Sequence, residues 1–399
     1  MPNRGNFIGG QDNLYVPDAP TIGTATGSVG GIASIAFTAP SDVGNDDITA
    51  YGASATDGTN VIGATGSSSP ITVTGLTNGT SYTAQVWAIN DYGNGPLSSA
   101  SNSFSPPAAR GIFAGGYSND PHNTIDYITI STDGNATDFG DMTHSNGFFS
   151  AGTSSSTRGI FSGGFNGGST RSNVIQYITI TSTGNATDFG DTSSGHYAGH
   201  GHANTTRGII TLGNTATGGA DTNIIEYITI ASIGNSTDFG DISRTANYGA
   251  SCASSTRGVI VVGEGTNTIE YITIASTGNT TDFGNLTRVT NNGAGGCSSA
   301  TRGVFFITPD GSNHIQYITI ASTGNATNFG DVSTDSASAM TGAVSSRVRG
   351  VTHVGHVGSV VNTLEKITID TAANSTDFGD LSVTRYGVAG CSNDHGGLQ

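Results

Sequence analysis

Residues 124–141, Thr-Ile-Asp-Tyr-Ile-Thr-Ile-Ser-Thr-Asp-Gly-Asn-Ala-Thr-Asp-Phe-Gly-Asp, belong to a unit that occurs six times in the chain. Each copy opens with an Arg-Gly pair and apolar residues, continues with Tyr-Ile-Thr-Ile or Lys-Ile-Thr-Ile, and closes on Phe-Gly followed by Asp or Asn. The repeated phenylalanines are Phe139, Phe189, Phe239, Phe283, Phe329 and Phe378. Their spacing of 44 to 50 residues is typical of propeller blades or helical arrays.

Composition decides between these two architectures. Helical repeats need Ala, Leu, Glu and Lys at helical spacing, whereas these units are β-branched runs separated by Gly, Asn and Asp. We expect four strands per unit, at 111–114, 124–131, 135–139 and 148–153 in the first copy. Ile125 and Ile128 point to opposite faces of the second strand, so both faces should be buried between neighbouring sheets.

The ends of the repeat array indicate closure. The first unit lacks the strand that precedes Arg158 in the second unit. After the last unit, residues 385–391 match residues 247–252, so a C-terminal strand is expected to complete the first sheet. This arrangement removes exposed sheet edges and predicts a six-bladed β-propeller over residues 107–399.

The segment Thr157-Arg-Gly-Ile-Phe-Ser-Gly-Gly164 resembles the strand pair of kelch propellers, which ends in a double glycine. The first unit keeps this pair at Gly115 and Gly116. The resemblance implies a kelch-like fold, although Phe139 and its equivalents stand where kelch units have tryptophan.

Residues 16–106 have short predicted strands at intervals of about ten residues, the pattern of a β-sandwich. The stretch 75–98, Gly-Leu-Thr-Asn-Gly-Thr-Ser-Tyr-Thr-Ala-Gln-Val-Trp-Ala-Ile-Asn-Asp-Tyr-Gly-Asn-Gly-Pro-Leu-Ser, resembles a fibronectin type III domain. The resemblance implies that Tyr82 forms the tyrosine corner, that Val86 and Ala88 face inward, and that Phe37 replaces the core tryptophan. The predicted fold class is therefore all-β, a fibronectin type III sandwich joined to a kelch-like propeller.

The charge balance excludes several functions. The 399 residues carry 13 basic and 29 acidic side chains, a formal net charge of −16, and Lys366 is the only lysine. Binding to nucleic acid needs clustered basic side chains, so no nucleic-acid partner is expected. No apolar run reaches about 18 residues, so no membrane insertion is expected. The N-terminus lacks the apolar core of a secretion signal, which predicts synthesis in a cytoplasm, followed by retention there or exit by another route.

Residues 1–15 fit neither domain. Phe7, Ile8, Leu14 and Tyr15 lie in a stretch rich in Gly and Asn, which suits either a frayed terminus or an arm that docks on a partner. We favour docking.

Six arginines open the Arg-Gly strands, and in five units a carboxylate ends the Phe-Gly-Asp segment. We expect one partly buried Arg–carboxylate bond per blade, with Asn285 replacing the acid in the fourth unit. The arginines are Arg110, Arg158, Arg207, Arg257, Arg302 and Arg349, and the acids are Asp141, Asp191, Asp241, Asp331 and Asp380.

No cofactor or metal is expected. The Asp-Phe-Gly segments are interpreted as turns, with calcium binding by Asp138 and Asp141 as the less favoured alternative. His196, His200 and His202 share a strand face suited to metal, yet a structural role is favoured. The Asn-X-Ser/Thr triplets beginning at Asn135 and its equivalents are interpreted as turns, and Cys252, Cys297 and Cys391 as small buried thiols.

The loops between the Arg-Gly strand and the Tyr-Ile-Thr-Ile strand vary freely between units. They should lie on one face, where loops on a rigid scaffold carry recognition. The candidate ligand-binding residues on these loops are Tyr117, Asp120, His122, Phe165, Asn166, Arg171 and Asp221.

The combination of arm, fibronectin-like module and lysine-poor propeller resembles accessory virion proteins of marine and cyanobacterial phages. It implies a non-enzymatic fibre, appendage or capsid decoration protein of the virion, made in the host and released by lysis. Its partners would be capsid, neck or tail proteins and a host-surface glycan or protein, bound through many copies. A cement protein without ligand and a glycan hydrolase or lyase are the alternatives.

Overall fold

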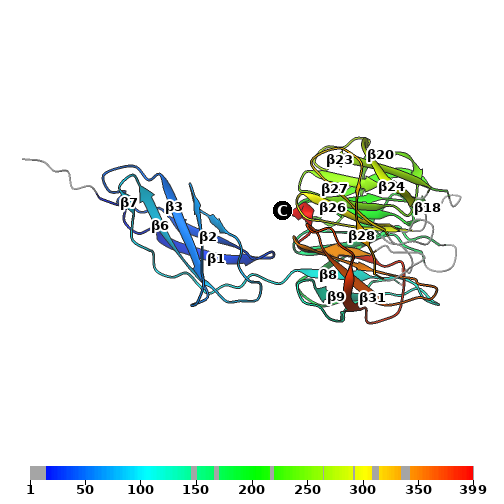
Figure 1. Ribbon diagram of the computed structural model, residues 1–399, viewed down its shortest axis with the longest axis horizontal. Coiled ribbons are helices and arrows are strands. Elements are labelled where there is room, and N and C mark those ends of the chain that lie inside the picture. The colour runs from blue at the N-terminus through cyan, green and yellow to red at the C-terminus, as the bar shows by residue number, and fades with distance from the viewer. Residues whose placement is uncertain are drawn as a thin grey trace, which may run out of the picture. The chain divides into compact units, whose positions relative to one another are not determined.

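The computed structural model describes residues 15–144, 151–165, 170–215, 220–263, 265–290, 293–307, 314–333 and 342–398. These residues form an all-β protein with many small antiparallel sheets, in two compact units, Met1–Ala108 and Ala109–Gln399. Figure 1 labels many of the strands. Among the described residues, no helix is long and apolar enough to span a bilayer.

Unit 1 contains two antiparallel sheets around one core. The first sheet has the order β1-β2-β5 and the second the order β4-β3-β6-β7. The strands are β1 (Thr21–Ser28), β2 (Ile32–Thr38), β3 (Ala50–Thr56), β4 (Val61–Gly66), β5 (Ile71–Val73), β6 (Thr83–Asn90) and β7 (Gly93–Asn94). Residues that alternate along both sheets, including Ile35 and Val86, are buried together, as a period of two predicts.

Unit 2 contains six four-stranded sheets among its described residues, and each sheet uses strands of the same four kinds. The inner strands are β33 (Ala389–Ser392), β11 (Ala151–Ser154), β16 (His200–Ala203), β21 (Ala250–Ala253), β25 (Ala294–Ser298) and β29 (Ala343–Ser345). The Arg-Gly strands beside them are β8 (Arg110–Ala114), β12 (Arg158–Ser162), β17 (Arg207–Thr211), β22 (Arg257–Val261), β26 (Arg302–Ile307) and β30 (Arg349–His353). We number the sheets 1 to 6 in this order.

The third and fourth strands of each sheet contain the repeated core sequence. The third strands are β9 (Thr124–Thr129), β13 (Val174–Thr179), β19 (Thr222–Thr229), β23 (Thr266–Thr273), β27 (His314–Thr319) and β31 (Thr363–Thr368). The outer strands are β10 (Thr137–Asp141), β14 (Thr187–Asp191), β20 (Thr237–Ala246), β24 (Thr281–Thr290), β28 (Thr327–Asp331) and β32 (Thr376–Asp380). A small extra pair, β15 (His196–Tyr197) and β18 (Asn214–Thr215), completes the strands, and the 3-10 helix η1 (Gly396–Leu398) ends the described chain.

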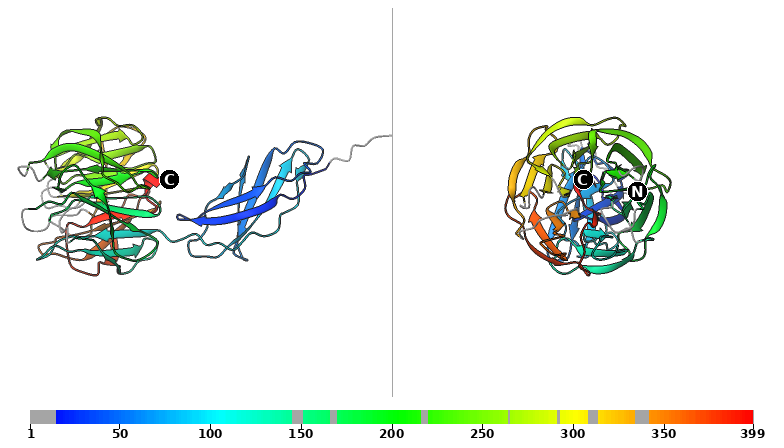
Figure 2. Two further views of the ribbon diagram at one scale, coloured as in Figure 1. Left: turned by 180° about the vertical axis from the view of Figure 1, so that it is seen from behind. Right: turned by 90° about the vertical axis from the view of Figure 1, so that its right-hand side faces the viewer.

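The first sheet joins both ends of unit 2. Its inner strand β33 pairs antiparallel with β8, with Ala389 opposite Ala114 and Ser392 opposite Gly111. In the right panel of Figure 2 the sheets follow one another around a common centre, and the first sheet lies beside the last.

Neighbouring sheets pack through the glycine of each Arg-Gly strand. A Cβ at Gly303 would lie 2.4 Å from Cys252 Sγ of the preceding sheet, and one at Gly258 would lie 2.0 Å from His202 Nε2. Gly111 of sheet 1 has the same relation to Val344 of sheet 6, so the contacts run in cyclic order. Cys252, Cys297 and Cys391 are free and buried at this position, which confirms their interpretation as small buried thiols.

We predict that Gly303→Ala lowers the free energy of unfolding of unit 2 by about 1–3 kcal/mol, because the added methyl group overlaps Cys252 Sγ. Cys252→Ala should relieve the overlap, so the double variant should be more stable than Gly303→Ala alone. Urea unfolding followed by near-ultraviolet circular dichroism measures both. Equal stability of the single and double variants would contradict this packing.

The asparagines of the Asn-X-Ser/Thr triplets join neighbouring sheets. Asn185 Oδ1 accepts a hydrogen bond of 3.0 Å from the backbone N–H of Asp141, and Asn235 Oδ1 accepts one from Asp191. The same contact joins sheet 1 to sheet 6, because Asn135 Oδ1 accepts a hydrogen bond from the backbone N–H of Asp380. The six asparagines therefore satisfy backbone donors of another sheet, a role that their interpretation as turn residues did not include.

The predicted Arg–carboxylate bond is wrong. Arg158 Nη1 instead donates to the carbonyl of Ile230 at 2.6 Å, and its guanidinium lies 4.4 Å from the ring centroid of Tyr177. The other five arginines bind the corresponding isoleucine carbonyls in the same way. The carbonyl of the neighbouring sheet lacks a strand partner there, so the guanidinium satisfies it without needing an acid.

Sheet 6 departs from this pattern. Lys366 occupies the tyrosine position, so Arg349 has no ring beneath it. Arg349 Nη1 pairs at 3.0 Å with Asp133 of sheet 1, and Lys366 Nζ binds the same carboxylate. Asp133 is the only acid among the six equivalent positions, so an ion cluster replaces the Arg–Tyr contact at this junction.

We predict that Asp133→Thr costs about 0.5–1 kcal/mol of stability in the native sequence, the range of a half-exposed ion pair. In a Lys366→Tyr background the same change should cost nearly nothing, because Arg349 then stacks on tyrosine as elsewhere. A double-mutant cycle in urea tests this expectation. Equal costs in the two backgrounds would show that Asp133 acts independently of Lys366.

Candidate functional site

The variable loops gather at one end of the sheets of unit 2. The Arg-Gly strand β8 runs from Arg110 toward the loop 115–123, and its antiparallel neighbour β33 runs from Ala389 toward the C-terminus. The loops therefore lie at the end opposite the C-terminal segment 393–398. We call these two ends the loop face and the tail face.

Five aromatic residues form a connected group on the loop face. Ring centroids are 5.9 Å apart for Tyr117 and Tyr386, 5.6 Å for Phe165 and Tyr197, and 6.5 Å for Tyr197 and Tyr248. All five side chains are partly exposed. We call these residues the aromatic cluster.

Ala198 lies at the centre of the aromatic cluster. It is buried, and Tyr197, Tyr248 and Tyr386 pack around it. Ala198 and Tyr248 have φ values of 56° and 55°, the left-handed region that non-glycine residues seldom adopt. The equivalent residue in sheet 1 is Gly387, with a φ of 67°. Two side chains are thus held at a position that glycine would occupy without strain, a feature that often accompanies functional sites.

Polar groups surround the aromatic cluster. The guanidinium of Arg171 lies 5.0 Å from the ring centroid of Tyr197. Asp221 accepts hydrogen bonds of 2.8 Å from the side-chain amides of Asn214 and Asn247. His122 Nε2 lies 2.9 Å from Ser118 Oγ, and burial lowers the pKa of His122. The cluster thus combines ring faces with a cation and amides.

The structure brings several predicted loop residues together. Tyr117, Phe165 and Arg171 belong to or contact the aromatic cluster, and Asp221 reaches it through Asn247, the neighbour of Tyr248. Asp120 is exposed and joins the loop through its backbone carbonyl, which accepts from Ser118 N–H. Asn166 lies outside the described residues.

Tyr197, Tyr248 and Tyr386 are members that the sequence analysis did not propose. They belong to a second set of loops, which lead from an outer strand to the next inner strand. Tyr197 and Tyr386 stand at equivalent places before their inner strands, a signal present in the sequence. Only the chain topology places these loops beside Tyr117 and Phe165.

Two small cavities lie between the six inner strands. The cavity nearer the loop face has a volume of about 40 Å³ and is bounded by residues that include Ala198, His200 and Tyr248. The cavity nearer the tail face has about 50 Å³, with His395 in its wall. These spaces suit a few water molecules and are too small for a sugar ring.

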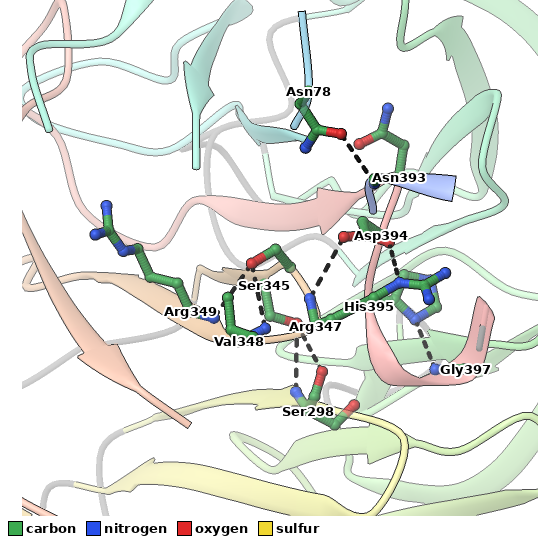
Figure 3. Close-up of polar contacts among 12 residues, drawn as sticks. Asn78, Ser298, Ser345, Arg347, Val348, Arg349, Asn393, Asp394, His395 and Gly397 are labelled. Atoms are coloured by element: carbon green, nitrogen blue, oxygen red, sulfur yellow. Dashed lines mark hydrogen bonds and ion pairs between the residues drawn. The ribbon is translucent and has the colours of Figure 1, made fainter. Parts of the chain in front are cut away.

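The C-terminal segment occupies the tail face (Figure 3). Arg347 Nε pairs at 3.0 Å with Asp394, and His395 Nε2 lies 3.1 Å from the carbonyl oxygen of Ser154. A Cβ at Gly397 would lie 1.8 Å from the carbonyl oxygen of Ala203, so the segment packs tightly against the inner strands. This segment covers the tail face, which leaves the loop face as the candidate surface for a ligand of unit 2.

Of the three neighbouring histidines, His196 and His202 are buried and His200 is half-buried. Burial lowers the pKa of His196 and His200 to about 4 and that of His202 to about 3. Among the residues that the structure describes, no group of three or more His, Cys, Asp or Glu side chains is placed to hold a metal. His202 fills the inner-strand position that Cys252 and Thr153 fill in other sheets.

No protein-family model matches the chain, and no curated protein matches it. Among solved structures, the chain is similar to a crystal structure of titin domains, with 22% sequence identity and a TM-score of 0.22. The similarity covers 24% of this chain and 33% of the titin chain. Function must therefore be inferred from the geometry of the chain itself.

Proposed function

We propose that the chain is a non-enzymatic bacteriophage virion protein that displays the aromatic cluster to a glycan or protein on the host surface. The observation that carries this proposal is the group of five partly exposed aromatic rings on one face of a repetitive scaffold. Sugar rings and protein side chains pack well on such surfaces, and display in many copies would strengthen weak binding.

The proposal includes a finer description of the fold. Unit 2 would be a six-bladed propeller closed by β33, supported by the cyclic contacts of Gly111, Gly303 and their equivalents and by the pairing of β33 with β8. Unit 1 would be a fibronectin type III domain. Its support is the hydrogen bond of 3.0 Å from Thr77 N–H to the hydroxyl of Tyr82, as a tyrosine corner requires.

The arm and unit 1 would attach the chain to capsid, neck or tail proteins. Of the proposed docking residues, Tyr15 is 55% exposed, while Phe7, Ile8 and Leu14 lie outside the described residues. Virion attachment rests on the resemblance described above, and exposed Tyr15 is consistent with it.

The non-enzymatic role is supported by how the buried acids of unit 2 are used. Glu226 binds the hydroxyls of Ser193 and Ser236, and Glu270 binds those of Ser243 and Thr280. These carboxylates hold loop backbones between sheets, as Asp126 does with Ser382 N–H at 3.0 Å. Each is engaged by donors of the scaffold.

Electron cryo-microscopy of particles carrying a tagged copy tests the proposal. We expect the tag on the head, neck or tail of virions. Particles without the tag would refute attachment to the virion. Incubation with host polysaccharide should yield no new reducing ends, and their appearance would favour a glycan hydrolase instead.

A further inference from the structure

Most cations of this acidic chain have a structural partner. Six arginines bind backbone carbonyls of a neighbouring sheet, as Arg158 does. Arg347, Arg385 and Lys366 pair with Asp394, Asp126 and Asp133. Among the cations in the described residues, these contacts leave Arg171, Arg244 and Arg288 to be explained.

These three arginines occupy three consecutive sheets at the loop face. Arg171 lies on the loop of sheet 2, between β12 and β13. Arg244 and Arg288 lie near the ends of β20 and β24, which are ten residues long where the other outer strands have five. Both side chains are exposed, and within the described part of the chain neither forms an ion pair.

Three members of the aromatic cluster, Phe165, Tyr197 and Tyr248, lie on loops that begin or end at these sheets. Arg171 stacks on Tyr197, whose ring is 6.5 Å from that of Tyr248, and Arg244 precedes Tyr248 by four residues. Asp221 also lies in this region, and two amides hold its carboxylate. Arg171 therefore stacks on the half-exposed ring of Tyr197, and the exposed Arg244 and Arg288 follow on the next two sheets of a chain whose net charge is −16.

We propose that the ligand is an acidic polysaccharide. Its carboxylate or sulfate groups bind Arg171, Arg244 and Arg288, and its sugar rings pack on Phe165, Tyr197 and Tyr248. Guanidinium groups bind such anions through paired hydrogen bonds, and charge complementarity selects them on an otherwise acidic molecule. This inference rests on the proposed function and names the class of its ligand.

Binding of the full chain to immobilised polygalacturonate and to carboxyl-reduced polygalacturonate tests the proposal, since the two polymers differ only in bearing a carboxylate or a neutral hydroxymethyl group at C6. We expect binding to the acidic polymer alone, weaker at higher salt. Arg244→Gln with Arg288→Gln should weaken binding at least tenfold, and Arg171→Gln should weaken it further. Val383→Gln is the matched control, because it places glutamine at the equivalent half-buried position after the outer strand of sheet 6, where no cation is lost.

Three results would overturn the proposal. Equal binding of both polymers, sensitive to Tyr197→Ala and Tyr248→Gly but insensitive to the arginine variants, would refute the acidic class and leave glycan binding intact. Equal binding of duplex DNA would assign the arginines to a different polyanion. Absence of binding to either polysaccharide would refute this inference, whereas virion attachment is judged separately by the tagged particles.

Discussion

Replacing Asp126 by alanine should lower the free energy of unfolding of unit 2 by about 3–5 kcal/mol, the cost of leaving a buried charge without its partner. Arg385 Nη2 lies 3.1 Å from Asp126 Oδ2, and both side chains are completely buried. Ser382 donates its N–H and hydroxyl to the same carboxylate. Without Asp126, the guanidinium of Arg385 would have only the carbonyl of Phe113 as its hydrogen-bond acceptor among the described contacts.

The matched control removes both charges. Asp126→Gln introduces the residue found at the equivalent positions Gln176 and Gln316, and Arg385→Met keeps most of the side-chain volume. Because a buried ion pair pays a desolvation penalty, this double variant should recover most of the lost stability. A double variant as unstable as Asp126→Ala would refute the electrostatic cause.

Unfolding of the two units can be followed separately. Trp87 is the only tryptophan and lies in unit 1, so its fluorescence reports unit 1 and should not change with Asp126→Ala. Near-ultraviolet circular dichroism of the tyrosines reports mainly unit 2, which holds nine of the thirteen.

Acid should unfold unit 2 below about pH 6 through its buried histidines. Burial lowers the pKa of His196, His200 and His395 to about 4, and that of His202 and His353 to about 3. In the unfolded chain these groups titrate near pH 6.5. Their contribution is fully present above pH 6.5 and is lost as the pH falls toward the folded pKa values, because the unfolded chain then binds more protons.

Each such histidine should cost about 1.4 kcal/mol per pH unit in this window, so five together should cost several kcal/mol by pH 5. The pKa of Asp394 is raised by burial, and this group opposes the trend weakly as the pH falls. Urea unfolding at pH 7.5, 6.0 and 5.0 measures the loss.

A variant with His200→Ala and His202→Cys isolates the histidines, since equivalent inner strands have Ala250 and Cys252 at these positions. Its stability should fall less steeply with pH, by about 2.8 kcal/mol per unit for the two groups removed. An unchanged slope between pH 6 and 5 would assign acid sensitivity to other groups.

The repeat pattern predicted the all-β class and the pairing of the C-terminal strand with β8 because both follow from local periodicity and from counting strands. It did not predict the hydrogen-bond partners of the repeated arginines and asparagines. Arg158 binds the carbonyl of Ile230, and Asn185 binds the N–H of Asp141. These partners are backbone N–H and C=O groups, which every residue type has. The sequence therefore could not show which backbone group each arginine or asparagine binds.

Only part of the candidate site could be predicted from the sequence. Variation between units identified the loops of Tyr117, Phe165 and Arg171, because loops differ where the scaffold does not require identity. The tyrosines of the second loop set, such as Tyr248, join them through the topology alone. Their left-handed backbone positions depend on packing around Ala198, which sequence periodicity does not describe.

The placement of β8 between β9 and β33 has a mechanical consequence. Unit 2 is tethered to unit 1 through Ala109, directly before β8, and the N–H of Arg110 donates to Asn393 Oδ1 at 2.8 Å. If unit 2 were bound at the loop face, a force applied through this tether would act along the length of β8. The hydrogen bonds of β8 to β33 on one side and to β9 on the other would resist that force. A force along a strand strains many of its hydrogen bonds at once, whereas a force that pulls a strand sideways off its neighbour breaks them one at a time. Tension would thus pass through the sheet that holds both ends of unit 2.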